Sequence, residues 1–149
     1  MSEFDPGDRF FDDERWEQRE PEAPHIWRTL GYERAVWEPG RQVIEWKAGE
    51  EYAFPSTSGY IVHGGMVATV LDSAMGGACW TLLNSDEAFL TADLRVEFLR
   101  TARLGLLRAE GRVIRRARRV VFCEGKLFDE DGALLATGRC TQILLPSEA

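Results

Sequence analysis

One segment of the chain, residues 62–84, limits most strongly what the chain can fold into. Its sequence, VHGGMVATVLDSAMGGACWTLLN, has a single carboxylate, Asp72, and neither lysine nor arginine. Apolar residues recur along it at the spacing of an α-helix, and a helix that is apolar on all sides has to be buried. About 20 helical residues span about 30 Å, so the rest of the chain has to enclose a rod of that length.

The flanking segments predict β-strands that can do this. Residues 32–49 contain two alternating runs joined by a Glu38-Pro39-Gly40 turn, which favours a β-hairpin, and residues 55–59 form a predicted loop. Four more strand-like runs follow the helix, at about 88–100, 104–115, 119–128 and 133–145. We therefore predict an α+β fold, in which a curled antiparallel sheet of about six strands wraps around one long buried helix. A second copy of the chain is the expected cover for the other face of the sheet.

Charge is distributed unevenly along the 149 residues. Residues 1–25 hold nine acids against three arginines, whereas nine arginines lie between 95 and 119. We therefore divide the chain into an acidic N-terminal extension, 1–25, with a short helix expected at about 12–19, and a single domain, 26–149. The arginine-rich segment indicates either a site for a small anionic ligand or a solvated strand face with local ion pairs.

Several classes of function lack support in the sequence. The net charge of −7 and the absence of a recognition motif argue against nucleic acid as a partner. No apolar run approaches the about 18 residues of a membrane span, and the N-terminus lacks the apolar core of a signal peptide, which predicts a cytoplasmic protein with no membrane partner. No motif indicates a metal or an organic cofactor, and three cysteines without a CxxC pair are expected to be buried free thiols: Cys79, Cys123 and Cys140.

Two features remain that can carry chemistry. His63-Gly64-Gly65 begins the predicted helix, where unpaired backbone N–H groups and the positive end of the helix dipole favour an oxyanion. Asp72 lies within the helix, where burial raises the pKa of a carboxyl group and suits it to act as a base or nucleophile. Structural explanations stand beside both: a tight turn would account for the glycines, and hydrogen bonds to a facing loop, or a position at a hydrated dimer interface, would account for Asp72.

The spacing of these two features has a consequence for assembly. Gly64 and Asp72 are eight residues apart, which is about 12 Å along a helix. A single ester or thioester carbonyl cannot contact both within one chain. If both act on one substrate, the site combines Gly64 of one subunit with Asp72 of another, and the protein is an obligate dimer with two equivalent sites.

The same segments resemble a known family. The stretch GYIVHGGMVATVLDSAMGGACWTLL, followed by TADLRVEFLRTARLG, is similar to the hotdog-fold acyl-CoA thioesterases of the phenylacetate-degradation (PaaI-like) subfamily, over about residues 40–145. The resemblance implies a hotdog fold and the hydrolysis of an acyl-CoA thioester to the free acid and CoA, without metal or organic cofactor. It also implies a homodimer, and dimers in this family often pair into tetramers.

The matching positions imply a role for each candidate residue. The Gly64 N–H would polarise the thioester carbonyl, and Gly65 would help to shape the turn. Asp72 would act across the dimer as nucleophile or general base. His63 would be structural or would orient the substrate, and Thr91 would help to place the attacking water.

The resemblance also suggests where substrate binds. Thr57 stands where some members carry Asn or Gln, and four arginines fall where members often contact the phosphates of CoA: Arg115, Arg116, Arg118 and Arg119. Four further residues are candidates for a pocket or for plain core: Met66, Met75, Trp80 and Phe89.

Two other functions use the same fold. A non-catalytic acyl-CoA-binding or sensing protein is one, although binding alone does not need a buried carboxylate such as Asp72. A hotdog hydratase or dehydratase is the other, but it needs a histidine and a carboxylate working together. His63 and Asp72 are about two and a half helical turns apart, which fits that requirement poorly within one chain.

Overall fold

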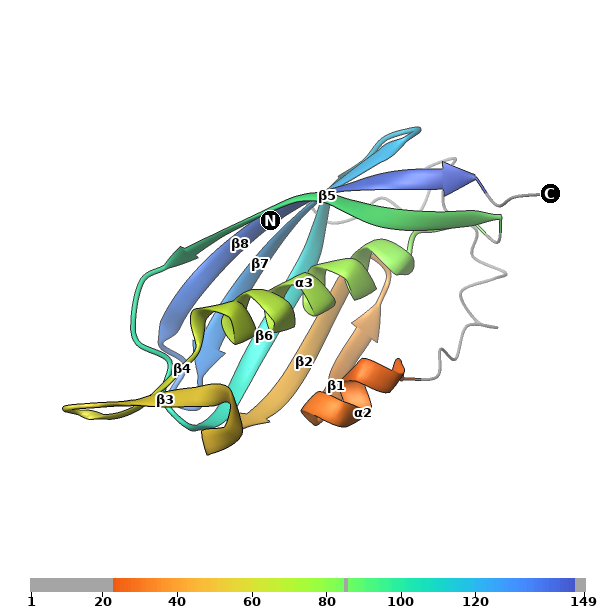
Figure 1. The fold of residues 1–149 in the computed structure, drawn as a ribbon. Helices are drawn as coiled ribbons and strands as arrows, with labels where there is room; N and C mark the ends of the chain where they lie inside the picture. The colour runs from red at the N-terminus through yellow and green to blue at the C-terminus, as the bar shows by residue number, and fades with distance from the viewer. Residues whose placement is uncertain (1–22, 85, 147–149) are drawn as a thin grey trace.

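A computed structural model describes residues 23–84 and 86–146 of the chain (Figure 1). Its elements in chain order are the helix α2 (His25–Leu30), the strands β1 (Tyr32–Glu38) and β2 (Arg41–Ala48), the short 3-10 helix η1 (Glu50–Tyr52), the strands β3 (Ala53–Ser56) and β4 (Gly59–Val62), the helix α3 (Gly64–Trp80), and the strands β5 (Glu87–Phe98), β6 (Gly105–Arg116), β7 (Val120–Asp129) and β8 (Leu134–Pro146).

Six strands form one antiparallel sheet that curls around α3 (Figure 1). Their order is β1-β2-β6-β7-β8-β5, so β5 follows the helix in the chain but lies at the far edge of the sheet, beside β8. The connection from β5 to β6 therefore crosses the sheet. The predicted α+β architecture, with one long helix inside a curled sheet of six strands, is confirmed.

The helix α3 forms the centre of the core, as its apolar sequence predicts. Six of its side chains are wholly inaccessible to solvent: Val70, Leu71, Ala74, Met75, Ala78 and Cys79. The closest approach to the sheet is at Gly111 of β6, where an added Cβ atom would overlap the backbone carbonyl of Ala74. Glycine in the strand therefore lets the sheet lie directly against the helix backbone.

The structure differs from the predicted elements at three places. The helix ends at Trp80 rather than near residue 84, and Thr81 Oγ1 instead accepts a hydrogen bond from the Gly40 N–H, at 2.8 Å. A six-residue helix, α2, precedes β1; it is too short to show a helical period in the sequence, yet it buries Trp27.

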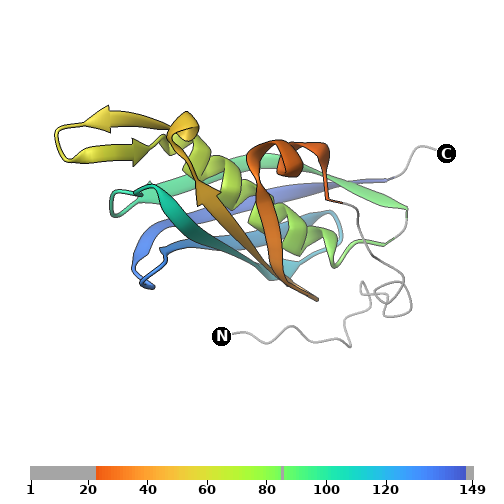
Figure 2. The same cartoon turned by 90° about the horizontal axis from the view of Figure 1, so that it is seen from below.

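The third difference concerns residues 55–59, which are not simply a loop. They belong to a separate two-stranded hairpin of β3 and β4, in which Pro55 pairs with Tyr60. The hairpin projects from the end of the molecule at which α3 begins (Figure 2). A two-stranded ribbon consists of edge strands, and edge strands are where proline is tolerated in a sheet.

Other expectations from the sequence have mixed outcomes. Cys79, Cys123 and Cys140 are buried free thiols, as predicted. The helix expected at about 12–19, and nearly all of the acidic extension, lie outside the described residues. Within residues 23–84 and 86–146, no helix is long and apolar enough to cross a membrane.

Candidate active site

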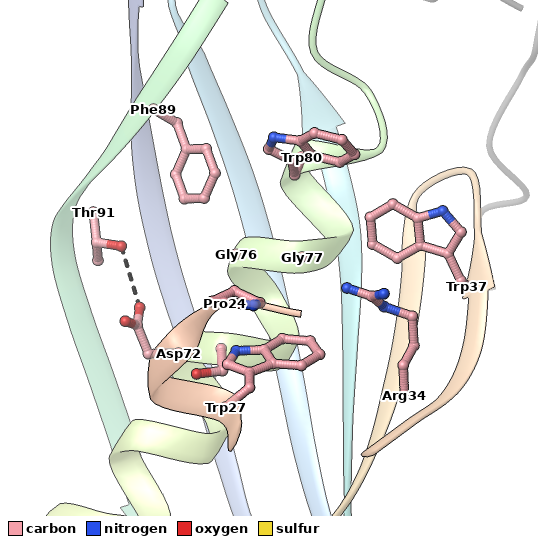
Figure 3. Close-up of a pocket in the computed structure, with 11 residues that line it drawn as sticks. Pro24, Trp27, Arg34, Trp37, Asp72, Gly76, Gly77, Trp80, Phe89 and Thr91 are labelled. Atoms are coloured by element: carbon pink, nitrogen blue, oxygen red, sulfur yellow. Dashed lines mark hydrogen bonds between the residues drawn. The ribbon is translucent and has the colours of Figure 1, made fainter. Parts of the chain in front are cut away.

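A cavity of about 410 Å³ opens beside the C-terminal half of α3 (Figure 3). Asp72, Gly76 and Gly77 of the helix form one side of it, and Thr91 of β5 faces Asp72. Its walls are largely aromatic, with contributions from α2, β1, α3 and β5: Trp27, Trp37, Trp80 and Phe89. The expected pocket residues Trp80 and Phe89 therefore line a cavity, whereas Met75 is buried in the core.

Asp72 is half-buried at the edge of this cavity. Thr91 Oγ1 donates a hydrogen bond to Asp72 Oδ1, at 3.2 Å. Burial raises the pKa of the carboxyl group above its ordinary value, and the Thr91 hydrogen bond lowers it by a smaller amount. A carboxylate with a raised pKa is a stronger base than an exposed one, so this environment suits Asp72 for proton transfer or nucleophilic attack.

Two register shifts, typical of β-bulges, occur in strands that line the cavity. In β5 the register with β8 shifts between Thr91 and Asp93, and in β1 the register with β2 shifts between Arg34 and Val36. In a regular strand, residues three apart point to opposite faces. The bulge in β1 puts Arg34 and Trp37 on the same face, where both line the cavity.

The first turn of α3 is organised by hydrogen bonds to its capping residue, His63. His63 is the N-cap, and its Nδ1 accepts a hydrogen bond from the Gly65 N–H at 2.9 Å. The carbonyl oxygen of His63 accepts from the N–H groups of Met66 and Val67. In the described part of the chain no acceptor lies on the Gly64 N–H, which leaves this group as a donor for a ligand.

Gly64 faces a second hollow, also of about 410 Å³, at the other end of the molecule. Phe98 of β5 lies against it, and a Cβ atom added at Gly64 would be 3.3 Å from the Phe98 ring. Gly64 and Asp72 therefore lie in different hollows, eight residues and about 12 Å apart on one uninterrupted helix. One chain carries the two groups but does not bring them together.

The remaining candidate residues lie on the periphery. Thr57 is exposed at the tip of the β3–β4 hairpin. Three of the four arginines are exposed near the β6–β7 turn: Arg115, Arg118 and Arg119. Arg116 is buried, and its Nη2 donates to both carboxylate oxygens of Glu87, at 2.8 and 2.9 Å. Its guanidinium is thus held within the protein, unlike those of its neighbours.

The described residues contain few other groups suited to chemistry. They hold no group of three or more His, Cys, Asp or Glu side chains that could bind a metal ion. Burial raises the pKa of the Cys79 thiol to about 12, which leaves it protonated and poorly nucleophilic at neutral pH.

Among the cavity residues that were not identified from the sequence, three contribute large side chains: Trp27, Arg34 and Trp37. Trp27 belongs to the unpredicted helix α2, and it lies beside the cavity only because of the tertiary fold. Arg34 and Trp37 are three apart in a predicted strand, which places them on opposite faces unless a bulge intervenes. No pattern in the sequence marks that bulge.

Comparison with known proteins identifies what this arrangement is similar to. Residues 59–136 match the thioesterase superfamily. A protein of Saccharolobus solfataricus whose name describes an esterase is 30% identical over 112 residues, which cover 75% of this chain and 77% of that protein.

Solved structures give the same result. A phenylacetic acid degradation-related thioesterase of Ralstonia eutropha JMP134 is 30% identical, covering 87% of this chain and 97% of that chain, with a TM-score of 0.75. A thioesterase of Staphylococcus aureus has the same fold at 18% identity, covering 83% of this chain and 100% of that chain, with a TM-score of 0.77.

Proposed function

The chain belongs to the thioesterase superfamily, and from this premise we propose that it hydrolyses an acyl-CoA thioester to the free acid and CoA. The observation that carries the proposal is the half-buried Asp72 at the edge of an aromatic cavity, with Thr91 donating to it. Thioester hydrolysis needs a base or nucleophile beside an apolar site for the acyl group, and this cavity combines the two. The free Gly64 N–H at a helix start supplies the donor that the developing oxyanion requires.

In the proposed reaction the carbonyl oxygen accepts a hydrogen bond from the Gly64 N–H of one subunit. Asp72 of the other subunit removes a proton from water as the water oxygen attacks the carbonyl carbon. The C–S bond then breaks, and CoA leaves as a thiolate that takes up a proton. Alternatively, the Asp72 carboxylate attacks the carbon itself, and water hydrolyses the resulting mixed anhydride. His63 acts as the helix cap, and Thr91 orients Asp72 or the attacking water.

A dimer formed through β5 would unite the two hollows. β5 is a 12-residue edge strand, and such an edge is a template for pairing with another chain. Its apolar side chains are unusually accessible in a single chain: Leu94 is 38% exposed and Phe98 is 58% exposed. We infer that two copies pair antiparallel along this strand.

Antiparallel pairing of β5 has a specific geometric result. Thr91, which binds Asp72, lies in the first half of the strand, and Phe98, which lies against Gly64, is its last residue. Antiparallel strands place the beginning of one beside the end of the other. Asp72 of each subunit would therefore approach Gly64 of its partner, which gives two equivalent sites.

The assignment of CoA as the thiol rests on the exposed arginines. Arg115, Arg118 and Arg119 are exposed within five residues of the chain, on either side of Arg116, which pairs with Glu87 at the start of β5. Guanidinium groups bind phosphate oxygens in a fork. Because Arg116 is held by Glu87, the proposal for CoA depends on the other three. Thr57, on the projecting hairpin, is a further candidate for contact with substrate across the dimer.

The test is release of free thiol from a panel of aryl and fatty acyl-CoAs, with wild type beside Asp72→Asn. We expect kcat to fall by about 10²-fold or more in the variant, because a base or nucleophile is lost. Asp131→Asn is the matched control: it neutralises an exposed carboxylate in the turn between β7 and β8, outside both hollows and outside β5, and should leave turnover unchanged. Unchanged turnover in Asp72→Asn would remove Asp72 from the mechanism. Acyl-CoA binding without turnover in wild type would favour the non-catalytic binding protein.

A further inference from the structure

Among the described residues that line the aromatic cavity, one is a cation: Arg34 of β1 (Figure 3). Its guanidinium carbon lies 4.9 Å from the ring centroid of Trp27 and 4.5 Å from that of Trp37. Two indole rings thus hold one guanidinium by cation–π contacts, which fixes its position better than a single contact does. The β1 bulge described above is what directs Arg34 and Trp37 to the same cavity.

A chain of hydrogen bonds through Gln42 holds the Nε side of this guanidinium. Arg34 Nε donates to Gln42 Oε1, at 3.1 Å. Gln42 is wholly inaccessible to solvent, and its Nε2 donates to the carbonyl oxygens of Ser73 and Ala74, at 3.0 and 3.3 Å. Ser73 directly follows Asp72 on α3. The backbone of the helix that carries Asp72 therefore also sets the orientation of Arg34, through Gln42.

The two terminal nitrogens of the Arg34 guanidinium donate no hydrogen bond to the described residues. Arginine has five N–H donors, and in the described ranges only the Nε–H of Arg34 has an acceptor. No carboxylate of the described residues forms an ion pair with it. Burial lowers the pKa of Arg34, yet a guanidinium stays protonated at any ordinary pH. A half-buried cation without a counterion is unfavourable, and a ligand anion would relieve that cost.

The cavity gives this cation a defined relation to the reaction. Asp72 and Arg34 line the same cavity without forming an ion pair, so they mark separate points of it. If the thioester carbon lies at Asp72, the remote part of the acyl group extends along the aromatic walls. The volume of the cavity, about 410 Å³, is near the lower end of the range for ligand cavities, and this size suits one ring better than a long acyl chain.

We propose that Arg34 is a specificity-determining residue for acyl groups that carry a carboxylate on a flat ring, at the end remote from the thioester. This inference rests on the proposed thioesterase function and names its substrate class. The two terminal nitrogens of Arg34 bind the two carboxylate oxygens as a fork, and the aromatic side chains enclose the ring. Arg34 takes no part in bond breaking.

The experiment compares two thioesters of matched shape, para-carboxyphenylacetyl-CoA and para-methylphenylacetyl-CoA. We expect wild type to have a kcat/KM at least about tenfold higher for the carboxylated substrate. In Arg34→Met, kcat/KM for that substrate should fall by roughly 10²-fold, because a site built for a polar partner discriminates strongly when one partner is missing. For the methyl substrate the change should be less than about threefold. Arg34→Lys keeps the charge but lacks the planar fork, so its kcat/KM for the carboxylated substrate should lie between those of wild type and Arg34→Met.

Arg108→Met serves as the matched control. Arg108 lies on β6, its side chain is 49% exposed, and it forms an ion pair with Glu45 outside the aromatic cavity, so its removal should change kcat/KM for neither substrate. Equal kcat/KM values in wild type, or equal losses on both substrates in Arg34→Met, would overturn the inference and leave the thioesterase function intact. Hydrolysis of unsubstituted or fatty acyl-CoAs alone would overturn it as well. If no acyl-CoA releases thiol, the proposed function fails and this inference fails with it. The wild-type ratio needs no variant, so a folding defect in Arg34→Met leaves the test in place.

Discussion

At Asp72 two opposing effects act on one carboxyl group. Burial beside aromatic side chains disfavours the charged form and raises the pKa, whereas the Thr91 hydroxyl stabilises the charged form and lowers it. Burial is the larger effect, so the pKa stays above the ordinary range. A base of this kind acts only when deprotonated, so activity should decline as the pH falls through the pKa of Asp72.

Thr91→Val tests this balance directly. Valine has nearly the shape of threonine but cannot donate a hydrogen bond, so the charged form of Asp72 loses its partner and the pKa rises further. The acid limb of the kcat/KM profile should therefore move to higher pH. Thr69→Val is the control, because Thr69 is on the same helix as Asp72 but its hydroxyl donates to the Gly65 carbonyl oxygen. An acid limb that stays in place in Thr91→Val would mean that another group produces it.

Some residues of the candidate site could be identified from the sequence, and others could not. Asp72 stands out because it is the single carboxylate in an apolar helix, and Gly64 because glycines and a histidine mark the helix start. Arg34 and Trp37 do not stand out, since their meeting depends on a bulge. Alternation predicts faces only within an unbroken register, and a one-residue shift reverses every side chain after it.

At the scale of elements, the contact between α3 and β6 sets how closely the sheet wraps the helix. Strand positions that face the helix carry glycine at Gly111, Gly125 and Gly138. At Gly111 an added methyl group would overlap backbone atoms of Ala74 and Met75, which cannot move without displacing the helix. At Gly138 the nearest atom would be the terminal methyl group of Met75, at 3.1 Å, while the Arg95 carbonyl oxygen and a Leu71 methyl group lie at an ordinary contact distance of 3.6 Å.

This contrast predicts different stabilities for two alanine variants. Gly111→Ala should lower the free energy of unfolding by about 3 kcal/mol, as overpacking against rigid backbone does. Gly138→Ala should cost less than about 1 kcal/mol, because a methionine tip can change rotamer. Urea unfolding at one fixed protein concentration would measure both, since association stabilises the folded state. Equal losses in the two variants would show that the helix backbone can yield at Gly111.

The elements themselves were predictable to the extent that their patterns are local. The long helix and the six strands of the sheet have a clear period over many residues, whereas α2 has too few residues to show one. Strand order is not local: nothing in the alternation of residues 88–100 distinguishes a neighbour of β6 from the far edge beside β8. That edge position is what exposes β5 and makes it available for pairing.

At the scale of the whole molecule, the proposed site exists only in a dimer, and subunit complementation can test this. Asp72→Asn removes the carboxylate from one half of each site. Gly64→Pro removes the N–H from the other half, and proline is well tolerated there because Gly64 is the first helical residue. The backbone of His63, with φ −58° and ψ 132°, is already suited to precede proline.

Each variant alone should lose about 10²-fold or more in kcat, because both sites of each homodimer lack one group. When the two are unfolded together and refolded as an equal mixture, about half of the dimers contain one chain of each kind. One of the two sites in such a dimer combines an intact Gly64 with an intact Asp72, so the mixture should recover about a quarter of the wild-type activity.

Gly64→Ala supplies the control for this experiment. It introduces the same Cβ atom beside the Phe98 ring but keeps the N–H, so it should retain most of the activity if the hydrogen bond, rather than space, is what Gly64 provides. Complementation can restore activity only if the two groups come from different chains. A refolded mixture no more active than its two components would therefore place Gly64 and Asp72 in separate functions, and the 12-residue edge of β5 would need another explanation.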